Sequence, residues 1–333
     1  MKVLLHSDLQ QSIEKSGVGR AMAHQQMALD TQQEVTYSTN PKADYDIIHI
    51  NTIFPQSYLK SLKSKRQHKK VIYHAHSTEE DFRDSFKLAN VVAPLFKWWI
   101  KKCYNSADLI LTPSEYAKSL LEDYQLTPPI KVVSNGIDLD YWQAEDVEIR
   151  KFKQRYQADP SRPCIISVGL PIKRKGIIDF VALAKRLPEY DFIWFGYVDP
   201  KFLPRDVKEA YETELANLTF AGYIERDEVR VAYAACDLFL FLTFEETEGI
   251  VLLEALASRT NTIIRDIPAF KEPYIHQENI YKGRNIEEFQ ELIEDLLTEE
   301  RPTLIEAGYQ LAEQRSIENV GKQLNHYYHQ VLS

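Results

Sequence analysis

The stretch LFLFLTFEETEGIVLLEALA, residues 238–257, reads as a strand, a loop and a helix in that order. The apolar run 238–243 predicts a strand buried on both faces, as in a parallel sheet. An acidic loop follows, and Gly249 permits a sharp turn before an apolar run that predicts a helix. A strand that passes through a short loop into a helix is the repeating unit of α/β folds.

The same alternation extends over most of the 333 residues. The predicted strands are 3–6, 34–38, 46–51, 71–76, 109–113, 131–134, 164–169, 191–196, 218–222, 238–243 and 262–266. Amphipathic stretches of helical length lie between them, among them 18–29, 94–105, 177–187 and 227–236. The pattern therefore predicts two doubly wound parallel sheets covered by helices.

A polar, proline-containing stretch between Asp138 and Pro163 indicates the linker. We expect an N-terminal domain at 1–155, a C-terminal domain at 156–315 and a C-terminal helix at 316–333 that can cross back to the N-terminal domain. Two such domains leave a cleft, and ligands bind at the carboxyl ends of parallel strands.

Composition is that of a soluble globular protein, with 44% hydrophobic and 27% charged residues. No apolar run reaches the roughly 18 residues of a membrane-spanning helix, and the first residues lack the features of a signal peptide. The three cysteines, Cys103, Cys164 and Cys236, have no metal-ligand spacing and are expected to be reduced and mostly buried. We therefore expect a cytoplasmic protein.

The formal net charge of −9 is distributed unevenly. Residues 1–150 carry 18 Lys and Arg against 19 Asp and Glu, whereas the segment from Lys60 to Lys102 alone has 11 basic and 4 acidic residues. The remainder of the chain is acidic and contains no recognition motif for nucleic acid, so we expect no nucleic-acid partner.

Two groups of candidate binding residues belong to the first domain. Gly17 and Gly19 precede a predicted helix, where backbone N–H groups can approach a phosphate, although a tight turn is an equal alternative. His74 and His76 end a predicted strand and are expected to point to opposite sides of it, so that only one faces a ligand. Two structural histidines are the alternative.

Two further groups belong to the second domain. Lys173, Arg174 and Lys175 follow a predicted strand, where they can neutralise a diphosphate or simply be solvated. The acidic loop and helix of 238–257 are the strongest candidate: the helix N-terminus at Gly249 and Ile250 can hold phosphate, Glu246 can meet a sugar, and Glu254 needs a partner if it is buried.

Together these residues resemble the retaining glycosyltransferases of family 4, which have the GT-B fold. The most specific parts are Glu246 and Glu254 with seven residues between them, Ser134–Asp138, and the loop 168–176. The resemblance implies that Lys175 binds the diphosphate of a UDP-sugar, Glu254 its ribose, and Glu246 with the backbone of Gly249 and Ile250 the hexose. It also implies that His76 faces the donor hexose and the acceptor, and that no metal or other cofactor is needed.

The chain departs from the family at Leu170, where an arginine is common, so Arg174 or Lys173 is expected to take over a phosphate contact. Glu248 replaces a usual aromatic residue.

A closer resemblance, to bacterial synthases that add a second hexose to glucosyl-diacylglycerol, rests on 15–25, 76–83 and 174–180. It implies a glycolipid acceptor and a peripheral position on an anionic membrane at the cytoplasmic face. Cations and tryptophans suited to such a surface are Lys65, Arg66, Lys69, Lys70, Trp98, Trp99, Lys101 and Lys102. The alternative is that Phe96, Trp99 and Ile100 belong to the core and that the lysines form a solvated face.

Three functions remain open at this point. The first is transfer of glucose or galactose from UDP-glucose or UDP-galactose to a glycolipid. The second is the same chemistry on a soluble, polysaccharide or protein acceptor. The third is a catalytically silent protein that keeps the fold for binding.

Overall fold

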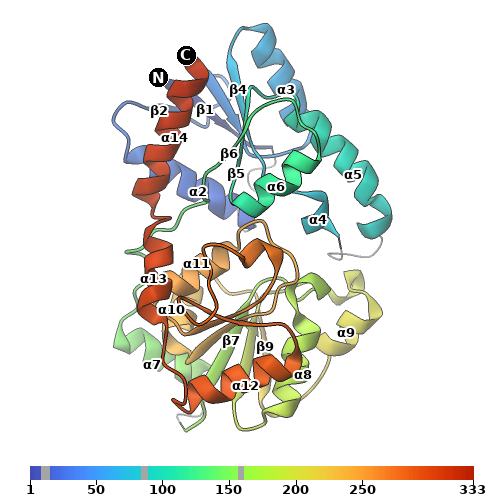
Figure 1. Ribbon diagram of the computed structural model, residues 1–333, viewed down its shortest axis with the longest axis vertical. Coiled ribbons are helices and arrows are strands. Elements are labelled where there is room, and N and C mark those ends of the chain that lie inside the picture. The colour runs from blue at the N-terminus through green and yellow to red at the C-terminus, as the bar shows by residue number, and fades with distance from the viewer. Residues whose placement is uncertain (9–15, 84–88, 157–160) are drawn as a thin grey trace. The chain divides into compact units, whose positions relative to one another are not determined.

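The computed structural model describes residues 1–8, 16–83, 89–156 and 161–333 (Figure 1). Lys15 of the stretch 15–25 and the pair Asp159-Pro160 of the expected linker lie outside the described residues. The chain forms two compact units. The first comprises 1–82, 90–137 and 315–333, and the second comprises 83–89 and 138–314.

The first unit contains a parallel six-stranded sheet in the order β2-β1-β3-β4-β5-β6. Its strands are β1 (Lys2–His6), β2 (Thr36–Ser38), β3 (Ile47–Ile50), β4 (Lys70–His74), β5 (Leu109–Thr112) and β6 (Ile130–Val132). Its helices are α2 (Gly17–Asp30), α3 (Pro55–Arg66), α4 (Glu79–Phe82), α5 (Ala89–Tyr104), α6 (Glu115–Asp123) and α14 (Ile317–Leu332).

Alternate side chains of this sheet enter two separate cores. Ile47 and Ile72 pack with Leu29 of α2 and Leu324 of α14 on one face. Their neighbours Ile48, Val71 and Tyr73 pack with Ile100 and Tyr104 of α5 on the other face. This alternation follows from the two-residue period of a strand, and it explains why these strands are apolar at nearly every position.

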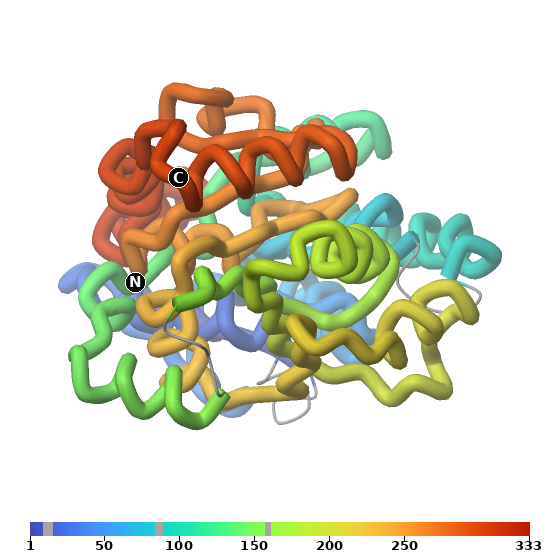
Figure 2. The backbone as a smooth tube through the Cα atoms, turned by 90° about the horizontal axis from the view of Figure 1, so that it is seen from below, coloured from blue at the N-terminus to red at the C-terminus, as the bar shows by residue number. Residues whose placement is uncertain are grey.

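The second unit contains another parallel six-stranded sheet, in the order β12-β11-β10-β7-β8-β9. Its strands are β7 (Cys164–Val168), β8 (Asp191–Phe195), β9 (Leu218–Gly222), β10 (Leu238–Phe241), β11 (Thr262–Arg265) and β12 (Tyr281–Gly283). Its helices are α7 (Asp146–Arg155), α8 (Ile177–Arg186), α9 (Arg205–Tyr211), α10 (Arg226–Ala235), α11 (Ile250–Ala257), α12 (Ile286–Leu297) and α13 (Ile305–Glu313). Figure 2 shows α8 and α12 as neighbouring coils, and both contribute to one core with Phe192 and Leu240 of the sheet.

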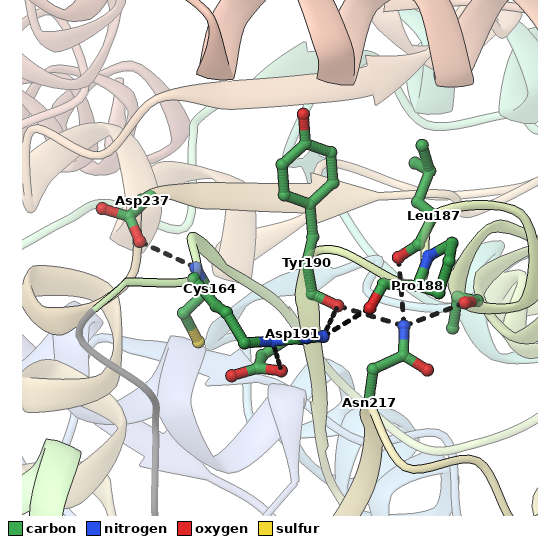
Figure 3. A network of polar contacts seen from close by, with 9 residues as sticks. Cys164, Leu187, Pro188, Tyr190, Asp191, Asn217 and Asp237 are labelled. Atoms are coloured by element: carbon green, nitrogen blue, oxygen red, sulfur yellow. Dashed lines mark hydrogen bonds and ion pairs between the residues drawn. The ribbon is translucent and has the colours of Figure 1, made fainter.

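Polar contacts tie together the amino ends of β7, β8 and β9 (Figure 3). The Asp237 carboxylate accepts a hydrogen bond from the Cys164 N–H at 2.7 Å. The Asn217 amide nitrogen donates to the carbonyls of Ala184, Leu187 and Tyr190 at 2.9–3.1 Å. These bonds satisfy backbone groups at the amino edge of the sheet. Ligands of such folds bind at the opposite edge, where the carboxyl ends of the strands lie.

The predicted fold class is confirmed: both sheets are parallel and doubly wound, and each predicted strand has a counterpart in the structure. The C-terminal helix does belong to the first unit, since Val320, Leu324 and Tyr328 of α14 pack in its core. The sequence analysis missed the three-residue strand β12, which carries only one buried apolar side chain, Tyr281.

The units meet in sequence at Ile137 and Asp138, ahead of the expected boundary at 155. The reason is α7, which the sequence analysis assigned to the first domain. Its Glu148 pairs with Arg230 of α10 at 2.6 Å, and its Phe152 ring lies 5.9 Å from that of Phe195. The polar face of α7 suggested a linker, but these contacts place the helix in the second unit.

Candidate active site

In the second unit the loops that follow β7 and β10 are side by side, because these two strands are neighbours in the sheet. The Phe244 N–H donates to the Arg174 carbonyl at 2.7 Å, and the Arg174 guanidinium donates to the Glu245 carbonyl at 2.8 Å. Gly176 has φ +83°, and a Cβ there would overlap the Leu242 carbonyl. The Lys175-Gly176 pair of the sequence is thus where two loops approach too closely for a side chain.

The cations of the first loop separate into two groups. Lys175 forms an ion pair with Glu246, and an Arg174 nitrogen lies 3.9 Å from the same carboxylate oxygen. Lys173 turns instead to Asp206 on α9, at 3.1 Å in an exposed position. Of the two replacements considered for the missing arginine at Leu170, the structure brings Arg174 and not Lys173 to the acidic loop.

Glu246 is buried, and its carboxylate is paired with the cations of the first loop. The Thr243 hydroxyl also lies 3.2 Å from its Oε1. A buried carboxylate without partners would be costly, so the cationic loop and the threonine compensate for its desolvation. A ligand phosphate and this carboxylate would therefore compete for Lys175.

The helix α11 begins directly behind this pair. Gly249 has φ +82° and ψ 72°, and a Cβ there would lie 3.1 Å from the Phe241 ring, so the turn requires glycine. Ile250 is the first helical residue. The first N–H groups of a helix lack partners within the helix, and a role for Gly249 and Ile250 in binding the donor stays a prediction. Glu254, one turn later, is buried, with the Tyr233 hydroxyl 3.4 Å from its carboxylate.

Arg265 contacts the residues around the loop after β10, and the sequence did not predict it. It is buried at the end of β11, where it forms an ion pair with Asp179, donates to the Leu242 carbonyl at 3.0 Å, and lies 3.9 Å from the Phe244 ring. Burial lowers its pKa from the usual value. The signal in the sequence was a charged residue at the end of an apolar strand, because an arginine in such a position is rarely buried unless it is paired.

In the first unit, His74 at the end of β4 and His76 two residues later lie together. The rings of His74 and His76 stack at 4.3 Å between centroids, and the ring of His49 stacks on His74 at 5.4 Å. The expectation that His74 and His76 point to opposite sides is wrong, because residues two apart on a strand share a face. Burial lowers the pKa of His76 to about 4 and that of His49 to about 3, so both rings are neutral at pH 7.

The glycines of the predicted N-terminal loop are at the start of α2. The Ser16 hydroxyl caps this helix by accepting from the Gly19 N–H at 3.3 Å, and a Cβ on Gly17 would meet open space. A phosphate role for Gly17 and Gly19 at this helix N-terminus stays a prediction.

The predicted membrane residues divide between core and surface. Trp99 packs against the core, and its indole N–H donates to the Ile53 carbonyl at 2.6 Å, as the alternative interpretation required. Trp98 is 57% exposed, on the same side of α5 as Val91 and Leu95. Among the cations, Lys65 pairs with Asp108 and Lys69 with Asp44, whereas Arg66 and Lys102 are exposed and Lys70 and Lys101 are partly buried.

In the part of the chain that the structure describes, every helix is too short or too polar to cross a bilayer. Among the same residues, His, Cys, Asp and Glu side chains nowhere form a group of three able to hold a metal ion. Cys103 and Cys164 are buried, and burial raises the pKa of each thiol to about 12, as expected for structural cysteines.

Comparisons with known proteins agree with this arrangement. The model for "Glycosyl transferases group 1" matches residues 148–311, and the model for "Glycosyltransferase Family 4" matches residues 36–141. The structure of Anabaena Alr3699/HepE in complex with UDP and glucose superimposes with a TM-score of 0.78, at 16% identity, over 99% of this chain and 100% of that one. The fold is thus that of the GT-B glycosyltransferases.

Sequence relatives narrow the assignment. The processive diacylglycerol alpha-glucosyltransferase of Acholeplasma laidlawii is 38% identical over 100% of this chain and 99% of its own. The alpha-galactosylglucosyldiacylglycerol synthase of Streptococcus pneumoniae is 24% identical over 72% of this chain and 65% of its own. The chain belongs to glycosyltransferase family 4, and it is a hexosyltransferase that transfers a glycosyl group from a nucleotide sugar. The resemblance noted in the sequence is confirmed.

Proposed function

We propose that this enzyme transfers a hexose from a UDP-sugar to a diacylglycerol glycolipid such as glucosyl-diacylglycerol, with retention of anomeric configuration and without a metal. The observation that carries the proposal is the 38% identity, over the full length of both chains, with a diacylglycerol glucosyltransferase. Glucose is the expected hexose, and galactose is the alternative that the pneumococcal relative represents.

The donor half of the proposal is supported by the contacts of Arg174, Lys175 and Glu246. Two cations beside a helix N-terminus can neutralise a diphosphate and the charge that develops as the nucleotide leaves. On binding, the diphosphate would replace Glu246 as the partner of Lys175. The released carboxylate would then accept hydrogen bonds from hexose hydroxyls, so that donor binding itself prepares the sugar site.

The acceptor half is supported by the exposed side of α5. Val91, Leu95 and Trp98 form an apolar strip there, and Lys102 lies 5.3 Å from the Trp98 ring. A hollow of about 490 Å³ beside the strip is lined by Glu79, Pro94, Lys97, Trp98, Lys101, Lys102 and Asn105. Apolar and cationic side chains on one helix suit the surface of an anionic membrane, which we propose is the cytoplasmic face.

The test is product analysis with purified protein. UDP-glucose or UDP-galactose is supplied with glucosyl-diacylglycerol in vesicles containing anionic lipid, and parallel reactions omit the acceptor lipid or include EDTA. A diglycosyl lipid that forms in EDTA, with one donor preferred, is the expected result. Donor hydrolysis without a lipid product would overturn the glycolipid acceptor and direct the search to soluble or polymeric acceptors. Loss of product in EDTA would overturn the metal-independent step.

A further inference from the structure

A chain of buried polar side chains leads to His76 through the first unit. It lies on the sheet face that α2 and α14 cover, and it is formed by residues from four separate segments. Its members, from one end to the other, are Tyr328 on α14, His49 on β3, Gln25 on α2, Asn51 after β3 and His76 after β4. The first four are buried, with exposures of 4% or less.

Each link between these side chains is a hydrogen bond of 2.7–3.0 Å. The Tyr328 hydroxyl lies 2.7 Å from His49 Nδ1, and Gln25 Nε2 lies 2.7 Å from the same ring nitrogen. Gln25 Oε1 accepts from Asn51 Nδ2 at 2.9 Å. Asn51 Oδ1 is 3.0 Å from His76 Nε2. Water has little access to these atoms, so each side chain depends on the next to satisfy its polar groups.

The direction of the chain determines which nitrogen of His76 carries the proton. An amide donates through nitrogen and accepts through oxygen only. Because Asn51 uses its nitrogen toward Gln25, it presents its oxygen to His76, and His76 Nε2 must therefore be the donor. His76 Nδ1 is then left as an acceptor.

We propose that Gln25 and Asn51 are positioning residues that hold the His76 ring in its neutral Nε2–H tautomer, so that Nδ1 accepts a hydrogen bond from a hydroxyl of the bound sugar. The inference rests on the proposed function in one respect, that His76 faces the hexose. A site that accepts at this point favours ligands with a hydroxyl there over ligands that offer only an acceptor.

His74 adds a second observation. Its ring is buried between those of His49 and His76, and neither ring nitrogen has a hydrogen-bond partner among the described residues. Its role in the stack is therefore contact of ring faces and not hydrogen bonding. Stacking does not determine which nitrogen of His76 carries the proton, so the hydrogen bond to the Asn51 amide selects the tautomer.

The test reads the tautomer directly. Protein labelled with ¹⁵N-histidine is examined by NMR, with the His76 signals assigned through His76→Asn. The wild type is expected to show one neutral tautomer, Nε2–H. Gln25→Leu removes the acceptor that orients Asn51, so the amide can turn over and both tautomers should appear. Gln25→Glu restores an acceptor for Asn51 Nδ2 and should restore the single Nε2–H tautomer.

Kinetics give the second readout. We expect kcat to fall about 10-fold in Gln25→Leu, to recover largely in Gln25→Glu, and the KM for the donor to change less than about 2-fold in either. Ser106→Ala is the matched control. It removes another buried side-chain hydrogen bond of this unit, to Ser61 at 2.6 Å, that is not among the hydrogen bonds leading to His76. Thermal unfolding of all variants separates a loss of stability from a change of tautomer.

An Nδ1–H tautomer in the wild type would overturn the proposal, as would an unchanged single tautomer in Gln25→Leu. If Ser106→Ala loses as much activity as Gln25→Leu at equal stability, the hydrogen bonds that lead to His76 have only a structural role, and the proposal is overturned. The tautomer measurement needs no substrate. If it succeeds while no glycolipid product forms, the proposed acceptor fails and the positioning of His76 stands.

Discussion

In the proposed mechanism Glu246 has two partners in turn, and this can be measured. In the structure it is the ion-pair partner of Lys175, and in the proposed complex it binds the hexose while Lys175 binds the diphosphate. Glu246→Gln should therefore tighten the binding of UDP alone by about 10-fold, because Lys175 no longer has a competing carboxylate. The rate of hexose transfer should fall by roughly 100-fold, because the hexose loses that carboxylate.

Calorimetric titration of UDP and turnover of the UDP-sugar give the two numbers. Glu212→Gln is the control, since it removes one exposed negative charge from the end of α9 in the same unit, paired with Lys208 at 3.6 Å. Weaker binding of UDP to Glu246→Gln, or tighter binding to both variants, would contradict the exchange of partners.

His74 offers a prediction about stability and pH. Burial lowers its pKa well below 6.5, and protonation must therefore favour unfolding. A histidine that stays neutral only in the folded state contributes stability that is present above pH 6.5 and is lost as the pH falls, by about 2 kcal/mol at pH 5. His74→Leu, which removes this titration and no hydrogen bond, should unfold less readily than the wild type at pH 5, with a smaller difference at pH 7.

The same comparison with His49→Leu provides the contrast. His49 also stays neutral on burial, with a pKa of about 3, but it is bonded to Gln25 and Tyr328. Its replacement should flatten the pH dependence and also cost about 1–3 kcal/mol at pH 7 for the partners left unsatisfied. Chemical denaturation at pH 5 and pH 7 measures both, and a His74→Leu protein with the pH dependence of the wild type would refute the assignment.

The sequence predicted Lys175, Glu246 and Gly249 because they lie in two short loops with a recognisable spacing. It could not predict their contacts, such as the pairing of Glu246 with Lys175. The polar chain to His76 was missed for a different reason: Tyr328 and His49 are 279 positions apart, and periodicity indicates which face a side chain occupies but not what it meets there. Likewise, nothing local distinguishes Trp98 from Trp99, since the partner of Trp99 is the carbonyl of Ile53.

At the scale of elements, the turn into α11 depends on one glycine. Gly249→Ala adds the strain of a left-handed residue, about 1 kcal/mol, and a contact at 3.1 Å with the Phe241 ring. Gly222 is the matched control, because it has φ +75° at the end of β9 and a Cβ added there would have no atom within 4 Å. Gly249→Ala should therefore lose about 1 kcal/mol more stability than Gly222→Ala, and UDP affinity with it, as measured by denaturation and titration. Equal losses would show that the Phe241 contact is unimportant.

Where α14 packs against α2 (Figure 1), replacing a glycine by alanine should destabilise the protein, although the same change in an exposed helix stabilises it. In an exposed helix, Gly→Ala stabilises by up to about 1 kcal/mol. At Gly321, however, a Cβ would overlap the Ala28 carbonyl oxygen and lie 2.6 Å from Thr31 Oγ1. Gly321→Ala should thus destabilise by about 1–3 kcal/mol in denaturant unfolding, whereas the exposed neighbour Lys322→Ala should change stability by less than about 0.5 kcal/mol. A stabilised Gly321→Ala would mean that the two helices do not approach this closely.

Sequence patterns predicted most of these elements but not the boundary between the two units. The strands and helices were predictable because their apolar periods are long and clear, and the parallel order followed from the alternation. The boundary near Asp138 was not, because α7 has a charged surface and is held by a few specific contacts, such as Glu148 with Arg230. A helix attached by polar pairs resembles a linker in sequence.

At the scale of the whole molecule, a net charge of −9 opposes contact with an anionic membrane, so any binding must come from a local surface. The proposed surface is the strip of Leu95 and Trp98 on α5 with Lys101 and Lys102. Removing a large exposed apolar side chain from such a surface costs about 1–2 kcal/mol, and removing one cation about 1 kcal/mol. Sedimentation with anionic vesicles should therefore show Trp98→Ser binding about 10-fold more weakly, and Lys101→Gln/Lys102→Gln binding weakly and with less dependence on salt.

Phe202→Ser is the control for this experiment. Phe202 is 55% exposed, nearly as much as Trp98, but it belongs to the second unit and not to α5. It should bind vesicles like the wild type. Neutral vesicles should bind all proteins weakly, since the cations then have no partner, and raising the salt concentration should weaken binding of the wild type to anionic vesicles because the Debye length shortens. If Trp98→Ser binds as well as the wild type, or Phe202→Ser loses as much, the α5 strip is not the membrane surface and the acceptor must reach the enzyme by another route.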